Sequence, residues 1–197
     1  TVNVTNVNDN SPVFTSSATF SAAENQTSIG TVTATDADSG DSVTFTVSGS
    51  ELAITSGGVL SFNTAADYET KPTYTATVTA SDGTNTETQA ITVNVSDAND
   101  NAPIIESSPV FSAAENQTSI GTVTATDSDS SSIIFTVSGA ELAITSGGLL
   151  SFTSAPDYET KPTYTATVTA SDGTNTTNQS ITVNVTDVND NSPVFTS

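Results

Sequence analysis

The acidic residues of this chain gather in short motifs that occur more than once. The motifs read AEN, DxD, DYE, SDG and xxNDN, and each recurs at an equivalent place in a second copy. The acids outside these motifs are Asp41, Glu51, Glu87, Glu106 and Glu141. Lys71 and Lys161 are the only basic residues, so ion pairs within the chain could neutralise few of these charges. Carboxylates placed so regularly are suited to binding a cation.

The types of ligand atom indicate which cation. Calcium takes roughly six to eight oxygens from carboxylates, amide side chains, backbone carbonyls and water. Zinc, copper and iron sites use imidazole or thiolate ligands, and the chain contains neither His nor Cys. Magnesium is less favoured because it requires a tight octahedron and retains several waters. We therefore expect Ca²⁺ as the cofactor.

Other interpretations of the acids fit less well. The segment 36–41 resembles the opening of an EF-hand loop, but it lacks the glycine at the sixth place and an acid at the twelfth. Asp67 and Glu69 could be a glycosidase pair, yet both copies carry them and no Trp is present to stack on sugar. Serine and cysteine nucleophiles would lack a His base. Solvated loops remain the simplest alternative, and we expect no enzyme.

Composition excludes several classes of partner. The formal charge of −20 makes nucleic acid and anionic membrane surfaces poor partners, because little in the chain can neutralise phosphate. Hydrophobic residues make up 34% of the chain and alternate along it, which indicates a folded protein rather than a disordered acidic one. No segment approaches the roughly 20 apolar residues that span a bilayer, so we expect no direct membrane insertion.

The chain contains two copies of a unit of about ninety residues. The block at 21–36 recurs at 112–127, and the block at 67–86 recurs at 157–176. Such a fixed period indicates tandem repeats. The predicted division is a tail of a preceding repeat at 1–10, repeats at 11–100 and 101–190, and the start of a following repeat at 191–197. We expect the natural protein to be a longer array.

The pattern along each copy is that of β-strands. Val43, Phe45 and Val47 alternate with Thr, and similar alternation recurs at 74–80 and 91–95. Alternation of this kind, rich in Val, Ile, Thr and Tyr, predicts strands with one buried face. About seven such runs per copy predict an all-β chain of two seven-stranded, immunoglobulin-like Greek-key sandwiches end to end. We expect AEN, DYE and the 97–101 linker at the bottom of copy 1, with DxD and SDG at the top of copy 2.

The ordered set AEN, DxD, DYE, SDG and DxNDN resembles the cadherin repeat, and the resemblance covers both copies. It implies three calcium ions in a row at the 97–101 junction. By that resemblance the outer two ions would be held by Glu24, Asp67, Glu69, Asp97, the Ala98 carbonyl and Asp100, with Asp129 reaching across. The third ion would be held by Asn99, the Asn101 carbonyl, Asp127, Asp129 and Asp172.

The resemblance also implies partial metal sites at both ends of the chain. The site at the N-terminal end would consist of Asn8, the Asn10 carbonyl, Asp36, Asp38 and Asp82. The site at the other end would consist of Glu115, Asp157, Glu159, Asp187 and Asp190. Asn6 stands where the linker pattern expects Asp, but that position would serve the preceding copy.

Two departures from the cadherin pattern are visible. Ala23 and Ala114 stand where the family usually has Pro, and no Trp is present for the N-terminal Trp exchange of adhesive members. We expect extracellular repeats of a surface adhesin, bacterial by composition, whose calcium sites rigidify a stalk and whose partners are neighbouring repeats. The alternatives are repeats that themselves bind a ligand, either another copy or a polysaccharide, or repeats that flank a secreted hydrolase.

Overall fold

The computed structural model describes residues 1–2, 7–38, 40, 42–130 and 132–195. The chain divides into two compact units, unit 1 (Thr1–Ala98) and unit 2 (Asn99–Ser197). Both contain only strands, turns and loops among the described residues, which confirms the predicted all-β class. No helix that could cross a bilayer is found in that part of the chain.

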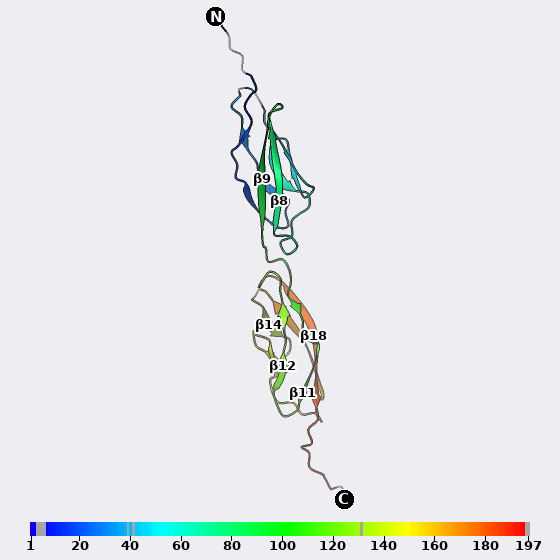
Figure 1. Ribbon diagram of the computed structural model, residues 1–197. Coiled ribbons are helices and arrows are strands. Elements are labelled where there is room, and N and C mark those ends of the chain that lie inside the picture. The colour runs from blue at the N-terminus through cyan, green and yellow to red at the C-terminus, as the bar shows by residue number, and fades with distance from the viewer. Residues whose placement is uncertain (3–6, 39, 41, 131, 196–197) are drawn as a thin grey trace. The chain divides into compact units, whose positions relative to one another are not determined.

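The two units have the same succession of strands (Figure 1). The strands of unit 1 are β1 (Val13–Phe14), β2 (Thr19–Ala23), β3 (Ser28–Thr31), β4 (Ala34–Thr35), β5 (Thr44–Val47), β6 (Leu52–Ile54), β7 (Val59–Phe62), β8 (Thr73–Ser81) and β9 (Thr86–Ser96). Those of unit 2 are β10 (Ile104–Ile105), β11 (Val110–Ala114), β12 (Ser119–Thr122), β13 (Ala125–Thr126), β14 (Ile134–Val137), β15 (Leu142–Ile144), β16 (Leu149–Phe152), β17 (Thr163–Ser171) and β18 (Thr176–Thr186).

Each unit is a sandwich of antiparallel strands with one parallel pair. In unit 1 one sheet has the order β2-β9-β8-β5, while β3-β7-β6 and the pair β1-β4 form the opposite layer. Strand β2 runs parallel to β9, from Thr19 opposite Thr92 to Ala23 opposite Ser96. Unit 2 repeats this arrangement, with β11 parallel to β18. Figure 1 shows β8 and β9 as the long pair of unit 1.

The seven predicted strand runs appear as nine strands because the first two runs are each interrupted. The backbone N–H groups of Thr15 and Ser16 both donate to the Thr33 carbonyl, at 2.8 and 3.3 Å. This interruption leaves β1 paired with β4, while β2 crosses to the other sheet and pairs with β9. The second run breaks at Val32, whose N–H donates to the Gly58 carbonyl at 2.8 Å.

Burial follows the predicted alternation. In β8 the side chains of Val78 and Ala80 are buried, and in β9 those of Ile91, Val93 and Val95 are buried. These residues join Leu52, Leu60 and Phe62 of the facing layer in one hydrophobic core. Unit 2 has an equivalent core of its own. Burying large aliphatic side chains contributes about 1.5–3 kcal/mol each, so these two cores hold the sandwiches together.

The topology explains which loops share an end of a unit. Because β2 and β9 are parallel, Glu24 and the 97–98 segment both follow strand ends at one end of unit 1. Strand β8 runs antiparallel to β9, so residues 67–69, which precede β8, lie at that same end. We call this the basal end. The 81–86 turn between β8 and β9 lies at the opposite, apical end.

The boundary between the compact units falls at 98/99, two residues before the predicted 100/101. The backbone N–H groups of Asp100 and Asn101 donate to Asp129, so this part of the linker is bound to unit 2. Within the predicted tail at 1–10, residues 3–6, which include Asn6, lie outside the described residues. Residues 196–197 of the predicted following repeat and Asp41 lie outside them as well.

Candidate metal centres

Glu24 is the buried centre of the basal cluster of unit 1, which we define as Glu24, Asp67 and Glu69. Its side chain is 5% exposed. One carboxylate oxygen, Oε2, accepts the Tyr68 N–H at 2.8 Å, and the other, Oε1, accepts the Ala98 N–H at 2.7 Å. Glu24 directly follows β2, so its carboxylate joins the DYE loop to the chain leaving β9.

The three carboxylates of this basal cluster lie together. Each of Glu24, Asp67 and Glu69 offers an oxygen atom within 4.8 Å of the other two. Asp67 is held by Thr70, whose N–H and hydroxyl donate to its two oxygens at 3.0 and 2.9 Å. Those side-chain and backbone bonds lower the pKa of Asp67. Asp67 therefore stays ionised beside two further carboxyl groups.

Asp97 extends this cluster along the linker. An oxygen of Asp97 lies within 4.8 Å of one of Glu69, and both side chains are exposed. The neighbouring Ala98 presents its backbone to the same region, because its N–H is bound to Glu24. The structure thus brings together the five unit 1 positions that the sequence predicted at this end.

Unit 2 has an equivalent basal cluster of Glu115, Asp157 and Glu159, whose oxygens also lie within 4.8 Å of one another. Glu115 is 4% exposed and accepts the Tyr158 and Val188 N–H groups, each at 2.7 Å. Hydrogen bonds from Thr160 lower the pKa of Asp157.

Glu159 differs from Asp157 in the direction of its pKa shift. A backbone hydrogen bond lowers the pKa of Glu159, but burial and the charges of Glu115 and Asp187 outweigh it and raise this pKa. Asp187 therefore lies close enough to act on the cluster electrostatically. Asp190 accepts the Asn116 side-chain amide at 2.6 Å. Both predicted linker acids of this end thus lie near other residues of the basal end of unit 2.

At the apical end of unit 2, Asp129 binds the linker backbone. Its Oδ2 atom accepts the N–H groups of Asp100 and Asn101 at 2.9 and 2.6 Å, and its Oδ1 atom accepts the Asn101 side-chain amide at 2.8 Å. Asp127 in turn accepts the Asp129 N–H at 2.9 Å through Oδ1. The other Asp127 oxygen, Oδ2, is buried and has no hydrogen-bond partner among the described residues.

A residue that sequence reasoning missed completes the apical cluster of unit 2. The Asn175 side-chain nitrogen, Nδ2, donates to the Asn99 Oδ1 atom at 3.1 Å, to the Asn101 carbonyl at 2.9 Å and to Asp172 Oδ2 at 3.3 Å. Asn175 looks like an ordinary turn residue in the sequence DGTN, and only its identical place in both copies could have drawn notice. We define this apical cluster as Asn99, Asn101, Asp127, Asp129, Asp172 and Asn175.

The apical cluster of unit 1 repeats these contacts around Asp38, which is 7% exposed. The Asp9 and Asn10 N–H groups donate to Asp38 Oδ2 at 3.0 and 2.8 Å, and Asp36 Oδ1 accepts the Asp38 N–H at 2.8 Å. The backbone hydrogen bond from Asn10 is the largest of the causes that lower the pKa of Asp38. The remaining oxygen of Asp36, Oδ2, is buried without a hydrogen-bond partner among the described residues.

Asn85 of unit 1 occupies the position of Asn175. Its Nδ2 atom donates to Asn8 Oδ1 at 2.9 Å, to the Asn10 carbonyl at 2.8 Å and to Asp82 Oδ2 at 3.3 Å. Burial of the Asp82 carboxylate raises its pKa, but hydrogen bonds led by the Asn85 N–H outweigh this and lower it. The structure therefore gathers all five predicted residues of the N-terminal site, together with Asn85.

The donor set of these clusters fits calcium. Every side-chain and carbonyl group predicted as a ligand offers oxygen, and the chain has no His or Cys to offer nitrogen or sulfur. A buried carboxylate oxygen without a hydrogen bond is costly unless a cation compensates it. Asp36 and Asp127 each contain such an oxygen. These observations fit a hard divalent cation better than solvated acidic loops.

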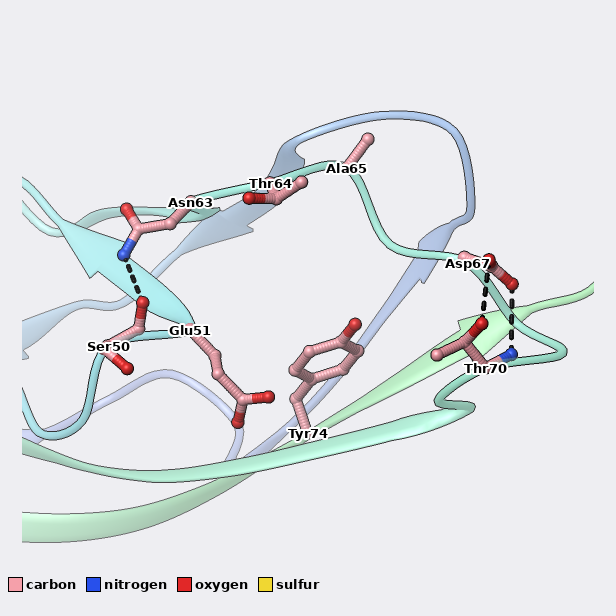
Figure 2. A pocket seen from close by; sticks show the side chains of 8 residues that line it. All are labelled: Ser50, Glu51, Asn63, Thr64, Ala65, Asp67, Thr70 and Tyr74. Atoms are coloured by element: carbon pink, nitrogen blue, oxygen red, sulfur yellow. Dashed lines mark hydrogen bonds between the residues drawn. The ribbon is translucent and has the colours of Figure 1, made fainter.

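A hollow beside Asp67 in unit 1 offers no comparable site. It has a volume of about 290 Å³ and is lined by residues of the 50–51 and 63–67 segments, Thr70 and Tyr74 (Figure 2). The Tyr74 ring is already engaged by protein groups, since Lys71 Nζ lies 4.7 Å from its centroid and the Phe62 ring lies 4.9 Å away. Lys71 also pairs with Glu51 at 2.5 Å. This hollow therefore presents no free aromatic platform for sugar.

Sequence comparison finds cadherin-type relatives over nearly the whole chain. The human Cadherin EGF LAG seven-pass G-type receptor 2 is 34% identical over 98% of this chain. The Drosophila melanogaster Protocadherin-like wing polarity protein stan is 34% identical over the whole chain. The chain spans only 8% and 6% of the lengths of these relatives. A family model described as a bacterial Ig domain matches residues 99–186.

Solved structures agree with the curated relatives. A crystal structure of mouse Cadherin-23 EC22-24 matches with a TM-score of 0.77 and 26% identity, covering 93% of this chain and 67% of that one. The crystal structure of the Protocadherin GammaB4 extracellular domain matches with a TM-score of 0.78 and 30% identity, covering 98% of this chain and 35% of that one. A Protocadherin gammaB7 EC3-6 cis-dimer structure matches with a TM-score of 0.77 and 27% identity over 94% of this chain and 53% of that one.

Proposed function

Because this chain belongs to the family of cadherin repeats, we propose that calcium bound at the ends of its units rigidifies an extended extracellular stalk. The repeats are of the extracellular, adhesion type and carry no enzymatic function, as in the receptors and ectodomains they match. We propose both the calcium ligands and their grouping into sites. We also propose a bacterial origin, which the match of 99–186 to a bacterial Ig domain favours.

The observation that carries the proposal is the basal carboxylate cluster in each unit. Three carboxylates lie within 4.8 Å of one another, and the central one, Glu24 or Glu115, is buried. The lysine of each unit is bound elsewhere, to Glu51 and Glu141. Like charges at this distance repel, and the repulsion is strongest where water is excluded. A divalent cation bound between the carboxylates is the simplest group that would attract all three of them and offset this repulsion.

The central junction would hold three ions. Asp97 and Ala98 end unit 1, and Asn99, Asp100 and Asn101 begin unit 2 without a spacer between them. The outer two ions would be held by Glu24, Asp67, Glu69, Asp97, the Ala98 carbonyl, Asp100 and Asp129. The third would be held by Asn99, the Asn101 carbonyl, Asp127, Asp129 and Asp172.

The end clusters would be halves of further junctions of the same kind. At the N-terminal end the ligands would be Asn8, the Asn10 carbonyl, Asp36, Asp38 and Asp82. At the other end they would be Glu115, Asp157, Glu159, Asp187 and Asp190. Neighbouring repeats would supply the remaining ligands, so the same chemistry would recur along a longer array. Because each repeat contacts only its neighbours, stiffness would depend on each joint separately.

The residues of the chain prepare these sites before an ion arrives. Backbone N–H groups fix the two oxygens of Glu24, and Thr70 fixes those of Asp67, so these carboxylates lose little further freedom on binding. Asp129 fixes the linker backbone in unit 2. Bound calcium would supply the positive charge that cancels the mutual repulsion of these groups. Both ends of the linker would then be ligated, and its freedom to bend would be lost.

Equilibrium dialysis against calcium tests the proposal. We expect the chain to bind at least three calcium ions, with magnesium at the same concentration displacing few of them. The control is a triple variant, Glu24→Gln, Asp67→Asn and Glu69→Gln, which keeps the shape of the basal cluster of unit 1 but removes its charge. That variant should lose the outer ions of the junction. A parent chain that binds no calcium, or a triple variant that binds as much as the parent, would show that the acids are solvated loops.

A homophilic contact is the second candidate function. It is favoured by the match to a protocadherin structure described as a cis-dimer, at 27% identity. Sedimentation equilibrium with and without calcium distinguishes a self-adhering repeat from a passive spacer. A purely monomeric chain at high concentration in calcium would exclude a strong homophilic contact and leave the stalk function unaffected.

A further inference from the structure

One asparagine in each unit lies against the oxygens that would hold the third calcium ion of a junction. Asn175 Nδ2 lies 2.9–3.3 Å from four oxygens, namely Asn99 Oδ1, the Asn99 and Asn101 carbonyls and Asp172 Oδ2. An amide NH₂ group has two hydrogens that carry partial positive charge, so it can satisfy four acceptors only by sharing these hydrogens among them. It lies in a cluster of acceptors that is suited to a cation.

The equivalent residue of unit 1 makes the same contacts. Asn85 Nδ2 donates to Asn8 Oδ1 and to the Asn10 carbonyl at 2.9 and 2.8 Å, and to Asp82 at 3.3 Å. The turn that carries this asparagine is identical in both units while the neighbouring DxD loops differ in sequence, and in each unit the amide lies on the same three kinds of oxygen. This recurrence indicates a built feature of the apical cluster rather than a chance rotamer.

Calcium and the amide nitrogen would compete for these oxygens, and a rotation of the amide resolves the competition. A half-turn about the last side-chain bond exchanges Nδ2 and Oδ1, which have nearly the same shape. An oxygen at the nitrogen's position would be about 3 Å from the surrounding oxygens, which is unfavourable without a cation. However, neighbouring oxygens on one calcium ion, each at roughly 2.4 Å, are also about 3 Å apart. The flipped amide therefore fits a shared coordination shell.

We propose that Asn85 and Asn175 are additional ligands of the apical calcium ions, which donate hydrogen bonds through Nδ2 until the ion binds and then turn Oδ1 toward it. The inference rests on the proposed calcium function and adds a residue to its sites. The amide holds the surrounding oxygens together before binding and thereby lowers the cost of assembling the site. The rotation of the amide would in turn be a local signal of calcium binding.

Calorimetric calcium titration of the full chain tests this with three variants at Asn85, whose cluster lies wholly in unit 1. Asn85→Ala removes the amide, and with it both the hydrogen-bond donor and the ligand, and we expect the affinity of the apical ion to fall on the order of tenfold. Asn85→Asp supplies a charged oxygen and should raise the affinity by a similar factor. Asn85→Leu, which fills the space without a ligand atom, should weaken binding as Ala does.

The matched control is Asn94→Asp, which adds the same charge on an exposed part of β9 toward the opposite end of the unit. It should change the apical affinity by less than about threefold, because distant surface charges are screened. Melting curves in EDTA identify any variant that has lost its fold, and the equivalent Asn175→Ala and Asn175→Asp variants provide an independent repeat of the test.

The outcomes separate this inference from the proposed function. Tighter calcium binding by Asn85→Ala would show that the amide hinders the ion, and unchanged binding would show that it plays no part. Either result would overturn the ligand role, while calcium binding by the parent would stand. Weaker binding by Asn85→Asp would overturn it as well. A parent chain that binds no calcium overturns both. Amide resonances of Asn85 give a second readout, since its side-chain protons should lose their acceptors and shift when calcium is added.

Discussion

Replacing Glu24 with Gln tests whether the buried carboxylate serves the backbone or an ion. The substitution keeps the size of the side chain but removes its charge, and it replaces one acceptor oxygen with an NH₂ group. In the structure both oxygens accept backbone N–H groups, from Tyr68 and Ala98. One of these donors would therefore lose its acceptor, while repulsion from Asp67 and Glu69 would be relieved.

The two roles predict different magnitudes. A buried donor left without a partner costs about 1–3 kcal/mol, and in EDTA the relief of repulsion opposes this loss. In calcium a ligand is also lost, and an ion present at a hundredfold excess over its Kd stabilises the folded state by about 2.7 kcal/mol. A domain of this size shifts in Tm by about 4–8 °C per kcal/mol. Glu24→Gln should thus lower the Tm of unit 1 by on the order of 10–20 °C more in calcium than in EDTA.

Differential scanning calorimetry of the parent and variant in both buffers measures this difference. Glu115→Gln is the internal replicate in unit 2, since Glu115 has the same burial and equivalent backbone partners. Glu87→Gln is the matched control, because Glu87 is exposed on β9 outside every repeated motif and should change Tm little in either buffer. Equal Tm losses in calcium and EDTA would refute the reasoning and leave Glu24 as a purely structural acceptor.

Three further predictions concern calcium removal, the linker residue Asp100 and the turn at Gly58. EDTA should lower the Tm of the parent and broaden the distribution of distances between the units in solution scattering, and identical curves with and without calcium would contradict a calcium-stiffened joint. Asp100→Ala should weaken more than one calcium site in a calorimetric titration, because Asp100 lies in the linker between both ligand sets, while Glu87→Ala should not. Gly58→Ala should destabilise unit 1 by at least about 2 kcal/mol, since Gly58 has a φ of +88° and an added Cβ would lie 2.2 Å from the Val32 carbonyl. Gly57→Ala, which meets nothing closer than 3.9 Å, is its control, and equal denaturant midpoints for the two variants would count against the turn argument.

The basal clusters could be predicted from sequence because they depend on strand order. Once AEN follows the first strand and DYE precedes a strand antiparallel to the last one, Glu24 and Asp67 must reach the same end of the sandwich. The resemblance to cadherin repeats then indicated the chemistry. The alternation of Val78 and Ala80 with Thr likewise gave the buried face of β8 directly.

Other features depend on tertiary contacts that no local pattern encodes. Asn85 and Asn175 resemble ordinary turn residues in the sequence, and their contacts appear only when linker oxygens 74–77 positions away are brought against their amides. The interruption of the first strand depends on two N–H groups that share the Thr33 carbonyl. The attachment of the linker to unit 2 is also a tertiary contact, because Asp129 accepts the backbone N–H of Asp100.

The parallel pairing of the first and last strands has a mechanical consequence. When a unit is pulled from its two ends, tension enters through the segment before β2 and leaves through the segment after β9. Because β2 and β9 run in the same direction side by side, this tension slides them past each other along their length. Their paired residues, from Thr19–Thr92 to Ala23–Ser96, are then loaded together rather than peeled one by one. Glu24 also accepts the Ala98 N–H just after β9, so this hydrogen bond lies at the point where the load would leave the pair.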